Sequence, residues 1–217
     1  MPVGWANPYE AAFNMNTLAI APLFTRIVDD LATHGWSQQA IFLPTDLTTQ
    51  LAKECHKRAQ RGQLELAGIG RGVAKVVHAG IRGDQIQWLE AGQHPAIDRY
   101  LGLIEQLRSA INQSLFLGLE DFEGHFALYP PGAFYKKHLD RFRDDDRRVV
   151  TCVAYLNEQW LPEQGGELRM YLDDQQTHDV VPQAGTLLVF MSEKWSHEVL
   201  PATRDRLSIT GWLRRRA

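Results

Sequence analysis

A chain of 217 residues has room for one domain with a sizeable hydrophobic core, whereas two small domains would each bury less surface. Hydrophobic residues make up 44% of the chain and charged residues 23%, which is an ordinary globular composition and excludes extensive disorder. The formal net charge of -3 gives no general attraction to nucleic acid or to an anionic membrane, so neither is expected as a partner.

The N-terminal residues and the cysteines indicate the compartment. Met1 to Glu10 lacks the basic and then apolar order of a secretory signal, and no apolar run approaches the ~18 residues that a membrane helix needs. Cys55 lies in a helix-like segment and Cys152 in a strand-like one, so no disulfide framework is indicated and we expect reduced core thiols. We therefore expect a cytoplasmic protein.

Three helices are predicted in the first half of the chain. Each begins at or beside a proline, which suits the first helical turn, and stops before a glycine. Their apolar residues recur at nearly helical spacing, so we interpret these stripes as packing surfaces. The helices are expected from Pro22 to Gly35, from Pro44 to Gly62 and from Pro95 to Gly118.

The segments between and before these helices are less regular. Residues 1–16 have no periodicity and are expected to form an arm of low order, and the apolar residues 40–43 predict a short strand. Residues 64–77 are rich in glycine, but no helix follows them as one follows a phosphate-binding loop. We therefore expect a mobile loop there.

From Phe122 the pattern changes to short β-type runs with turn signals between several of them. About eight strands in ~90 residues without intervening helices predict a double-sheet jelly roll, a mainly β fold with a cavity between its sheets. We expect one domain over residues 1–217, with helical support and a loop in residues 17–118 and the jelly-roll core in residues 119–217. The predicted strands are residues 122–129, 134–140, 148–156, 167–172, 178–181, 186–191, 198–200 and 206–213.

A metal site is predicted from three residues of the β half. His138 and Asp140 are two residues apart, so on a strand both side chains would lie on one face and could bind one ion. His197, from a distant strand, would complete two histidines and one carboxylate, a set that leaves positions of a ferrous ion open. Each residue alone could equally be a satisfied core or surface residue, and the same set suits a zinc hydrolase. The acidic run at residues 144–146 is expected to be a solvated loop.

Arg206 opens the last strand-like run. Alternation with a period of two places Arg206, Thr210 and Trp212 opposite Leu207 and Ile209. If Arg206 faces the cavity it needs an anionic partner, because an unpaired buried charge is very costly. A cosubstrate with a carboxylate would serve. The alternatives are an acidic residue of the chain and an exposed position for Arg206.

Several motifs follow one another in a specific order: Ile81 to Trp88, Tyr129-Pro130-Pro131-Gly132, Tyr135, His138-Leu139-Asp140, Arg148 to Cys152, Tyr155-Leu156-Asn157, Gly165 to Arg169, His197-Glu198-Val199 and Arg206 to Trp212. Together they resemble the prolyl hydroxylases that act on hypoxia-inducible factor, which are Fe(II)- and 2-oxoglutarate-dependent dioxygenases. The resemblance covers most of the chain from the first helix onward, and the ordered set is much more specific than any one motif.

The resemblance implies a role for each site residue. His138, Asp140 and His197 would bind Fe(II), with 2-oxoglutarate and dioxygen as cosubstrates and ascorbate as a reductant. The distal carboxylate of 2-oxoglutarate would be bound by four residues: Arg206, Tyr155, Tyr129 and Thr210. The substrate would be bound by Tyr135, Arg148, Trp212, Arg82 and Asp84, of which the last two lie on a finger that folds over it.

Some of these roles have structural alternatives. Tyr129 and Thr210 would serve equally as inward-facing strand residues. Arg148 would bond the peptide carbonyl of the substrate or pair with Asp84. Arg82 and Asp84 would alternatively form a salt bridge that holds a turn, since charged residues are common in turns.

The function implied by the resemblance is hydroxylation of a prolyl residue in a protein, with a link to oxygen sensing. The partner would be a protein that carries a target proline, such as a transcription or translation factor. One alternative is a hydroxylase of free proline or another small molecule, which would hardly require the long segment 64–88. Another is a jelly-roll binding module without catalysis. A nucleic-acid demethylase is disfavoured because no basic stripe is interleaved with aromatic residues.

Overall fold

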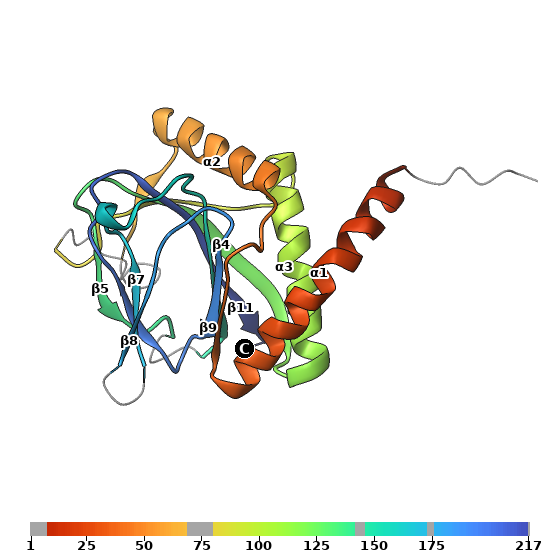
Figure 1. Ribbon diagram of the computed structural model, residues 1–217. Coiled ribbons are helices and arrows are strands. Elements are labelled where there is room, and N and C mark those ends of the chain that lie inside the picture. The colour runs from red at the N-terminus through yellow and green to blue at the C-terminus, as the bar shows by residue number, and fades with distance from the viewer. Residues whose placement is uncertain (1–7, 69–79, 142–145, 173–175, 217) are drawn as a thin grey trace, which may run out of the picture.

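The computed structural model describes residues 8–68, 80–141, 146–172 and 176–216, with the backbone alone for residues 8–20 (Figure 1). Eleven strands of the described residues form two antiparallel sheets. The larger sheet consists, in spatial order, of β1 (Trp36–Gln39), β9 (Leu187–Met191), β6 (Arg148–Tyr155), β11 (Arg206–Arg215), β4 (Leu119–Tyr129), β3 (Gln85–Trp88) and β2 (Glu65–Leu66). The smaller sheet consists of β5 (Tyr135–His138), β10 (Ser196–Val199), β7 (Leu168–Tyr171) and β8 (Thr177–Val180).

The larger sheet is covered on both faces, which explains why its strands are so apolar. On one face, Ile209 of β11 belongs to a core cluster that also contains helical residues such as Ile104. On the other face, Phe190 of β9 packs in a second cluster with Met170 of the smaller sheet. Burying a side chain of this size contributes roughly 1.5–3 kcal/mol. The predicted double-sheet jelly roll with supporting helices is confirmed.

Two of the helices have the predicted bounds. α2 (Thr45–Gln60) follows Pro44, and α3 (Pro95–Leu115) has its proline in the first turn. The N-terminus of α3 is capped by His94, whose Nδ1 accepts a hydrogen bond of 3.1 Å from the backbone N–H of Ala96. Figure 1 shows α1 and α3 beside the larger sheet, on the side away from β5, β7 and β8. The helices therefore leave the space between the two sheets open for a site.

The first helix is longer than predicted. α1 (Pro8–Thr33) contains Pro22 in its interior, so the predicted start at this residue is wrong. Residues 8–16, which were expected to belong to an arm, are helical, and residues 1–7 lie outside the described residues. Alanine, leucine and methionine are strong helix formers and are frequent between Pro8 and Pro22, so local propensity favours the extension.

The first strand lies before the predicted one. The prediction failed because the buried face of this strand is polar. Residues 40–43 form no strand, and Ile41 is 82% exposed. β1 instead pairs with β9 over residues 36–39 and buries Ser37 and Gln39. The Ser37 hydroxyl donates to Asp30 Oδ2 of α1 over 2.7 Å, and Gln39 Nε2 donates to Ser37 Oγ over 2.9 Å. An apolar pattern does not detect a strand that buries satisfied polar groups.

The eight strands predicted from Phe122 onward all occur, with small shifts at their ends. The short strands β2 and β3 extend the larger sheet beyond β4. Most of the glycine-rich loop expected over residues 64–77, including Gly70 and Gly72, lies outside the described residues, as do residues 144 and 145 of the acidic run. In the described part of the chain, no helix is long and apolar enough to span a membrane.

Candidate active site

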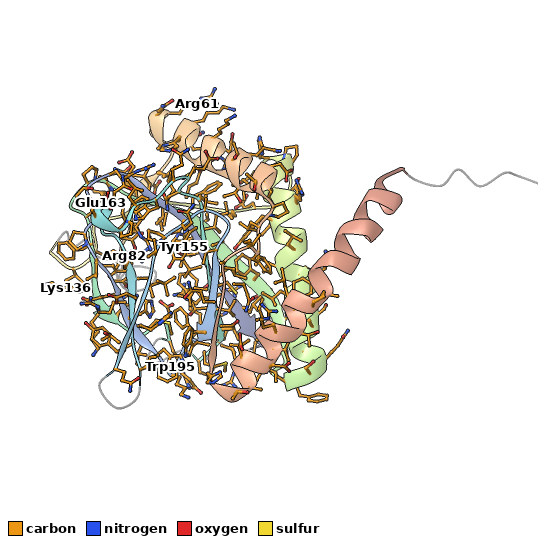
Figure 2. The ribbon with its side chains drawn as sticks, in the orientation of Figure 1. Arg61, Arg82, Lys136, Tyr155, Glu163 and Trp195 are labelled. Carbon is orange, nitrogen blue, oxygen red and sulfur yellow. The ribbon has the colours of Figure 1, made fainter. Side chains whose placement is uncertain are left out.

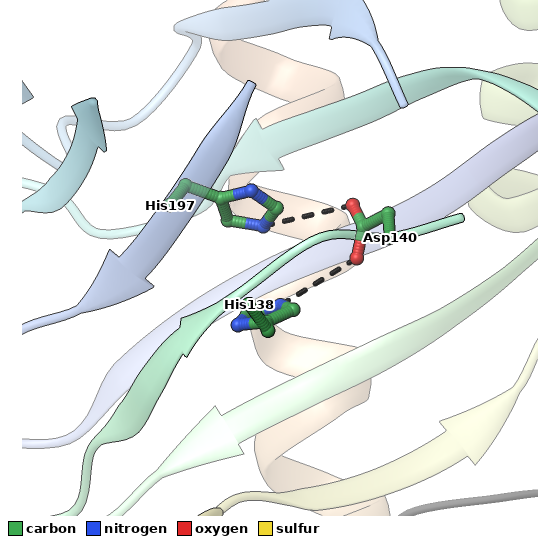
Figure 3. A group of neighbouring side chains, drawn as sticks. All are labelled: His138, Asp140 and His197. Atoms are coloured by element: carbon green, nitrogen blue, oxygen red, sulfur yellow. Dashed lines mark ion pairs between the residues drawn. The ribbon is translucent and has the colours of Figure 1, made fainter. Parts of the chain in front are cut away.

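Two neighbouring strands of the smaller sheet bring the three proposed ligands together. His138 of β5 lies directly opposite His197 of β10, and Asp140 follows two residues after His138 (Figure 3). One ligand atom from each residue lies within 4.8 Å of the others. His138 Nε2 is 3.5 Å from Asp140 Oδ1, and His197 Nε2 is 3.6 Å from Asp140 Oδ2. β5 ends at His138, so Asp140 reaches this cluster from the bend beyond the strand and not from the strand itself.

Backbone carbonyls orient both imidazoles. His138 Nδ1 lies 2.7 Å from the carbonyl oxygen of Lys136, and His197 Nδ1 lies 3.2 Å from that of Trp195. A carbonyl can only accept, so each Nδ1 carries the proton and each Nε2 keeps its lone pair for a metal. Burial lowers the pKa of His197 to about 4, which keeps this ring neutral at neutral pH.

Asp140 is held by a hydroxyl pair behind the site. Thr151 Oγ1 donates to Asp140 Oδ2 over 2.9 Å, and Ser192 Oγ lies 2.9 Å from the same Thr151 hydroxyl. Burial opposes the charge of Asp140, but His197, His138 and Thr151 outweigh burial and hold the pKa of the carboxyl below its usual range. Asp140 is therefore a fixed anion at neutral pH, as a metal ligand must be.

Thr151→Val is expected to weaken divalent metal binding by about 10–100-fold, because outer partners of metal ligands contribute affinity on this scale. The substitution keeps the shape of the side chain and removes the hydroxyl that bonds Asp140 and Ser192. The dissociation constant for Mn(II), measured by electron paramagnetic resonance on metal-free protein, is the readout. Thr186→Val, which removes another buried hydroxyl outside the cavity, should leave this constant unchanged. Equal Mn(II) affinity in Thr151→Val and the unaltered protein would contradict the role of Thr151.

The ligand cluster opens into a cavity of about 350 Å³ between the two sheets. Arg206 lies in this cavity and is 1% exposed. Its Nε donates to the carbonyl oxygen of Gly166 over 2.7 Å, and its guanidinium lies 5.2 Å from the ring centres of both Tyr129 and Tyr155. Gly166 has φ +78, and a Cβ there would come within 2.9 Å of Ala202, so a glycine is needed beside this arginine.

The buried polar atoms without a partner in the described part of the chain include Arg206 Nη2 and the hydroxyl of Tyr155. Buried donors are nearly always satisfied, and an unpaired buried charge costs several kcal/mol. A carboxylate accepts from a guanidinium and a phenol at once, so the residues present fit the distal end of 2-oxoglutarate. The alternative that Arg206 is exposed is wrong. The alternative that an Asp or Glu of the chain pairs with Arg206 does not account for Nη2, which has no hydrogen-bond partner among the described residues.

The outer part of the cavity is lined by aromatic and charged side chains. The ring of Tyr135 stacks on His138 with centroids 3.6 Å apart and an interplanar angle of 17°. The guanidinium of Arg148 lies 3.4 Å from the ring centre of Trp212, and its Nε donates to Glu123 Oε1 over 2.8 Å. Of the nine residues predicted to bind 2-oxoglutarate or the substrate, Tyr155 and Asp84 are not among the residues that line this space. The other seven line it: Arg206, Tyr129, Thr210, Tyr135, Arg148, Trp212 and Arg82.

The two residues predicted on the finger are paired with each other. Arg82 Nε and Nη2 donate to the two carboxylate oxygens of Asp84 over 2.6 and 2.8 Å. Asp84 is fully buried, and Arg82 lines the cavity. Asp84 thus forms an ion pair with Arg82, and Arg148 forms one with Glu123. The salt-bridge alternative describes this pair, and Asp84 has no surface that a substrate could touch.

Sequence reasoning missed His125, which the structure places in the cavity wall. Its ring lies 5.1 Å from that of Trp88 and 5.7 Å from that of Trp212, and burial lowers its pKa to about 4. Alternation along β4 from Tyr129 identifies His125 and Glu123 as inward-facing residues, so the signal was present. Alternation along β6 does place Thr151 on the face of Tyr155, but it does not show that Asp140 is the partner of Thr151, and Ser192 lies beyond the end of β9 without such a signal.

A jelly roll that holds two imidazoles, one carboxylate and a deeper unpaired arginine in one cavity defines the class of Fe(II)- and 2-oxoglutarate-dependent oxygenases. Comparison with known proteins agrees, because residues 124–214 match the family model described as the 2OG-Fe(II) oxygenase superfamily. The chain belongs to this superfamily.

Its relatives include prolyl hydroxylases of known structure. A Pseudomonas putida prolyl-4-hydroxylase is 61% identical, with 89% of this chain and 100% of that chain covered and a TM-score of 0.84. A Trichoplax adhaerens prolyl hydroxylase in complex with a hypoxia-inducible-factor peptide fragment is 27% identical, with 95% and 93% covered and a TM-score of 0.79. The Rattus norvegicus prolyl hydroxylase EGLN3 is 32% identical over 132 residues, 58% of this chain and 54% of that protein. The chain thus spans about half the length of this curated relative.

Proposed function

We propose that the chain is a prolyl 4-hydroxylase that acts on a proline within a protein, with Fe(II), 2-oxoglutarate and dioxygen. The observation that carries the proposal is the single cavity that holds both the His138, Asp140 and His197 cluster and the unpaired donors of Arg206. The prolyl-4-hydroxylase name of a relative that is 61% identical supports the same reaction.

The two halves of the cavity would hold the two reagents. His138, Asp140 and His197 would hold Fe(II), and a set of three protein ligands would leave room for 2-oxoglutarate and dioxygen. Arg206 and Tyr155 would bind its distal carboxylate, with Tyr129 and Thr210 beside them. When bound, iron and 2-oxoglutarate supply the oxidation of a C–H bond by dioxygen, with succinate and carbon dioxide as products and ascorbate as an accessory reductant.

The chain itself would position the proline and exclude water. Tyr135 and Trp212 offer flat apolar faces that suit a pyrrolidine ring, and both border the same cavity as the ligand cluster. Arg148, fixed by Glu123 and stacked on Trp212, is placed to bond a backbone carbonyl beside the proline. Holding the target carbon close to the metal in this way contributes to the rate by orientation alone.

We further propose that the partner is a protein with an accessible proline, such as a transcription or translation factor. A relative from Caenorhabditis elegans, 31% identical over 198 residues, is named hypoxia-inducible factor prolyl hydroxylase, which supports a protein substrate and a link to oxygen supply. The absence of a general positive charge supports a partner other than nucleic acid. We also propose that the chain forms one domain and that the protein is cytoplasmic.

Incubation with lysate from the source organism tests the function. Protein loaded with Fe(II) under anaerobic conditions is given 2-oxoglutarate, ascorbate and air, and tryptic peptides are searched by mass spectrometry for prolines that gain one oxygen. We expect such prolines in a few proteins, in step with succinate formation, and none when 2-oxoglutarate is omitted or zinc replaces iron.

Other outcomes would identify the alternatives. Hydroxylation of free proline without any modified peptide would indicate a small-molecule hydroxylase. Absence of succinate under every condition would indicate a binding module. Hydrolysis of a lysate component by zinc-loaded protein would indicate a zinc hydrolase.

A further inference from the structure

The segment before β3 connects the two sheets next to the metal ligands. β3 belongs to the larger sheet, but residues 81–83 pair with the start of β5 in the smaller one. The backbone N–H of Lys136 donates to Ile81 O over 2.9 Å, and that of Gly83 donates to Phe134 O over 3.0 Å. Figure 2 shows Arg82 and Lys136 on the same side of the molecule. This segment is therefore attached to the strand that carries His138.

The side chain of Arg82 is fixed in one position on this segment. Both oxygens of the fully buried Asp84 accept from it, and the paired geometry sets the plane of the guanidinium. The guanidinium lies 4.8 Å from the ring centre of Tyr135, within the range of a cation–π contact. Arg82 thus lies over the Tyr135 ring.

The Tyr135 ring also lies on the metal ligand His138. The Tyr135 and His138 rings are nearly parallel, with centroids 3.6 Å apart. Tyr135 thus contacts both Arg82 and His138, and we call these three side chains the stack. The backbone gives a second connection, because Lys136 accepts from His138 Nδ1 through its carbonyl and donates to Ile81 through its N–H.

The orientation of the His138 ring depends on the stack, whereas the His197 ring is supported by other neighbours. The side chain of His138 is 17% exposed and that of His197 is 5% exposed. His197 is held on its side by Phe190, whose ring is 4.8 Å away at an angle of 66°. The described residues place Tyr135 in that supporting role for His138.

We propose that Arg82, held by Asp84, is a positioning residue that fixes the plane of the His138 imidazole through Tyr135 and thereby sets the metal affinity. The inference rests on the metal site of the proposed function. It gives the Arg82–Asp84 pair a task beyond holding a turn, and it assigns Tyr135 a role that does not require a substrate. Metal affinity should therefore respond to Arg82 even when no substrate or cosubstrate is present.

Charge and position make opposite predictions for Arg82→Gln. This substitution removes a positive charge near the cation site and leaves the anionic Asp84, so electrostatics alone would strengthen metal binding. Loss of the stack would weaken it. We expect Mn(II) affinity to fall about tenfold, the lower end of the range for outer partners, because Arg82 acts through another residue.

A double-mutant cycle tests the pathway through Tyr135. Metal-free Arg82→Gln, Tyr135→Leu and the double variant are titrated with Mn(II) by electron paramagnetic resonance. If Arg82 acts through the Tyr135 ring, the double variant should bind Mn(II) no more weakly than Tyr135→Leu alone. Tyr135→Phe keeps the ring and should keep the affinity. Additive losses, unchanged affinity in Arg82→Gln or tighter binding would each overturn the inference.

Two further variants separate positioning from folding. Arg82→Gln/Asp84→Asn removes the unpaired buried carboxylate and should show the same loss of Mn(II) affinity with a restored melting temperature. Arg169→Gln breaks a bidentate pair of the same kind, with Asp179 at 2.8 and 2.7 Å, on the exposed side of the smaller sheet. It should bind Mn(II) like the unaltered protein, and an equal loss there would overturn the inference. Failure of the unaltered protein to bind any divalent metal would instead overturn the proposed function itself.

Discussion

Asp140→Ala is expected to abolish divalent metal binding and, with it, 2-oxoglutarate turnover. Asp140 is the only anion of the three ligands, and both imidazole Nε2 atoms lie within 3.6 Å of its carboxylate oxygens. Loss of an outer partner of a metal ligand already costs about 10–100-fold in affinity, so loss of the charged ligand itself should exceed that range. The measurements are the Mn(II) dissociation constant and the rate of succinate formation. His138→Ala should abolish turnover in the same way and leave the fold intact.

Asp179→Ala is the matched control for this experiment. Asp179 is a partly exposed carboxylate of β8 that pairs with Arg169, outside the cavity. Its removal should change neither the Mn(II) constant nor the succinate rate. A folded Asp140→Ala or His138→Ala protein that retains turnover would show that the ligand assignment is wrong.

Arg206→Lys is expected to raise the KM for 2-oxoglutarate by about 30-fold or more, while the Mn(II) affinity stays unchanged. Truncating one partner of a buried, hydrogen-bonded charge pair costs 2–5 kcal/mol or more, and about 2 kcal/mol corresponds to this factor. A lysine keeps the charge, but it cannot present two donors in one plane to a carboxylate. The substitution would also remove the Arg206 Nε–H group, which donates a hydrogen bond to Gly166 O.

Separate titrations with 2-oxoglutarate and Mn(II) distinguish this effect from general damage. Arg204→Lys makes the same chemical change at an arginine whose guanidinium lies 5.1 Å from the Trp160 ring, and it should leave both constants unchanged. Loss of Mn(II) affinity in Arg206→Lys, or an unchanged KM, would contradict a carboxylate-binding role for Arg206.

The β half of the chain was predictable because its short, mostly apolar β-type runs are separated by strong turn signals. Arg206, Thr210 and Trp212 could be placed on one face by counting alone, and all three line the cavity. The convergence of His138 and His197 was a hypothesis from motif order. It depends on the register between β5 and β10, which alternation within each strand does not determine.

The parts that sequence reasoning missed share a physical cause. β1 buries Ser37 and Gln39, and Asp140 is held by the hydroxyls of Thr151 and Ser192. In each case polar groups satisfy one another inside the protein, and no hydrophobic pattern indicates such a pair. The partner of Asp84 was likewise undecided, since two arginines were candidates and only the fold shows which one reaches it.

The central strand β11 carries residues of both the 2-oxoglutarate region and the substrate region on one of its faces. Arg206 lies at the beginning of this strand and Trp212 lies six positions later. Successive residues on one face of a strand are two positions and about 7 Å apart, so both side chains point to the same face. Loss or gain of a single residue between them would turn every later inward side chain toward the helices. Natural variation of substrate preference in such a chain should therefore arise by replacement of side chains on β11, with insertions confined to the loops at its two ends.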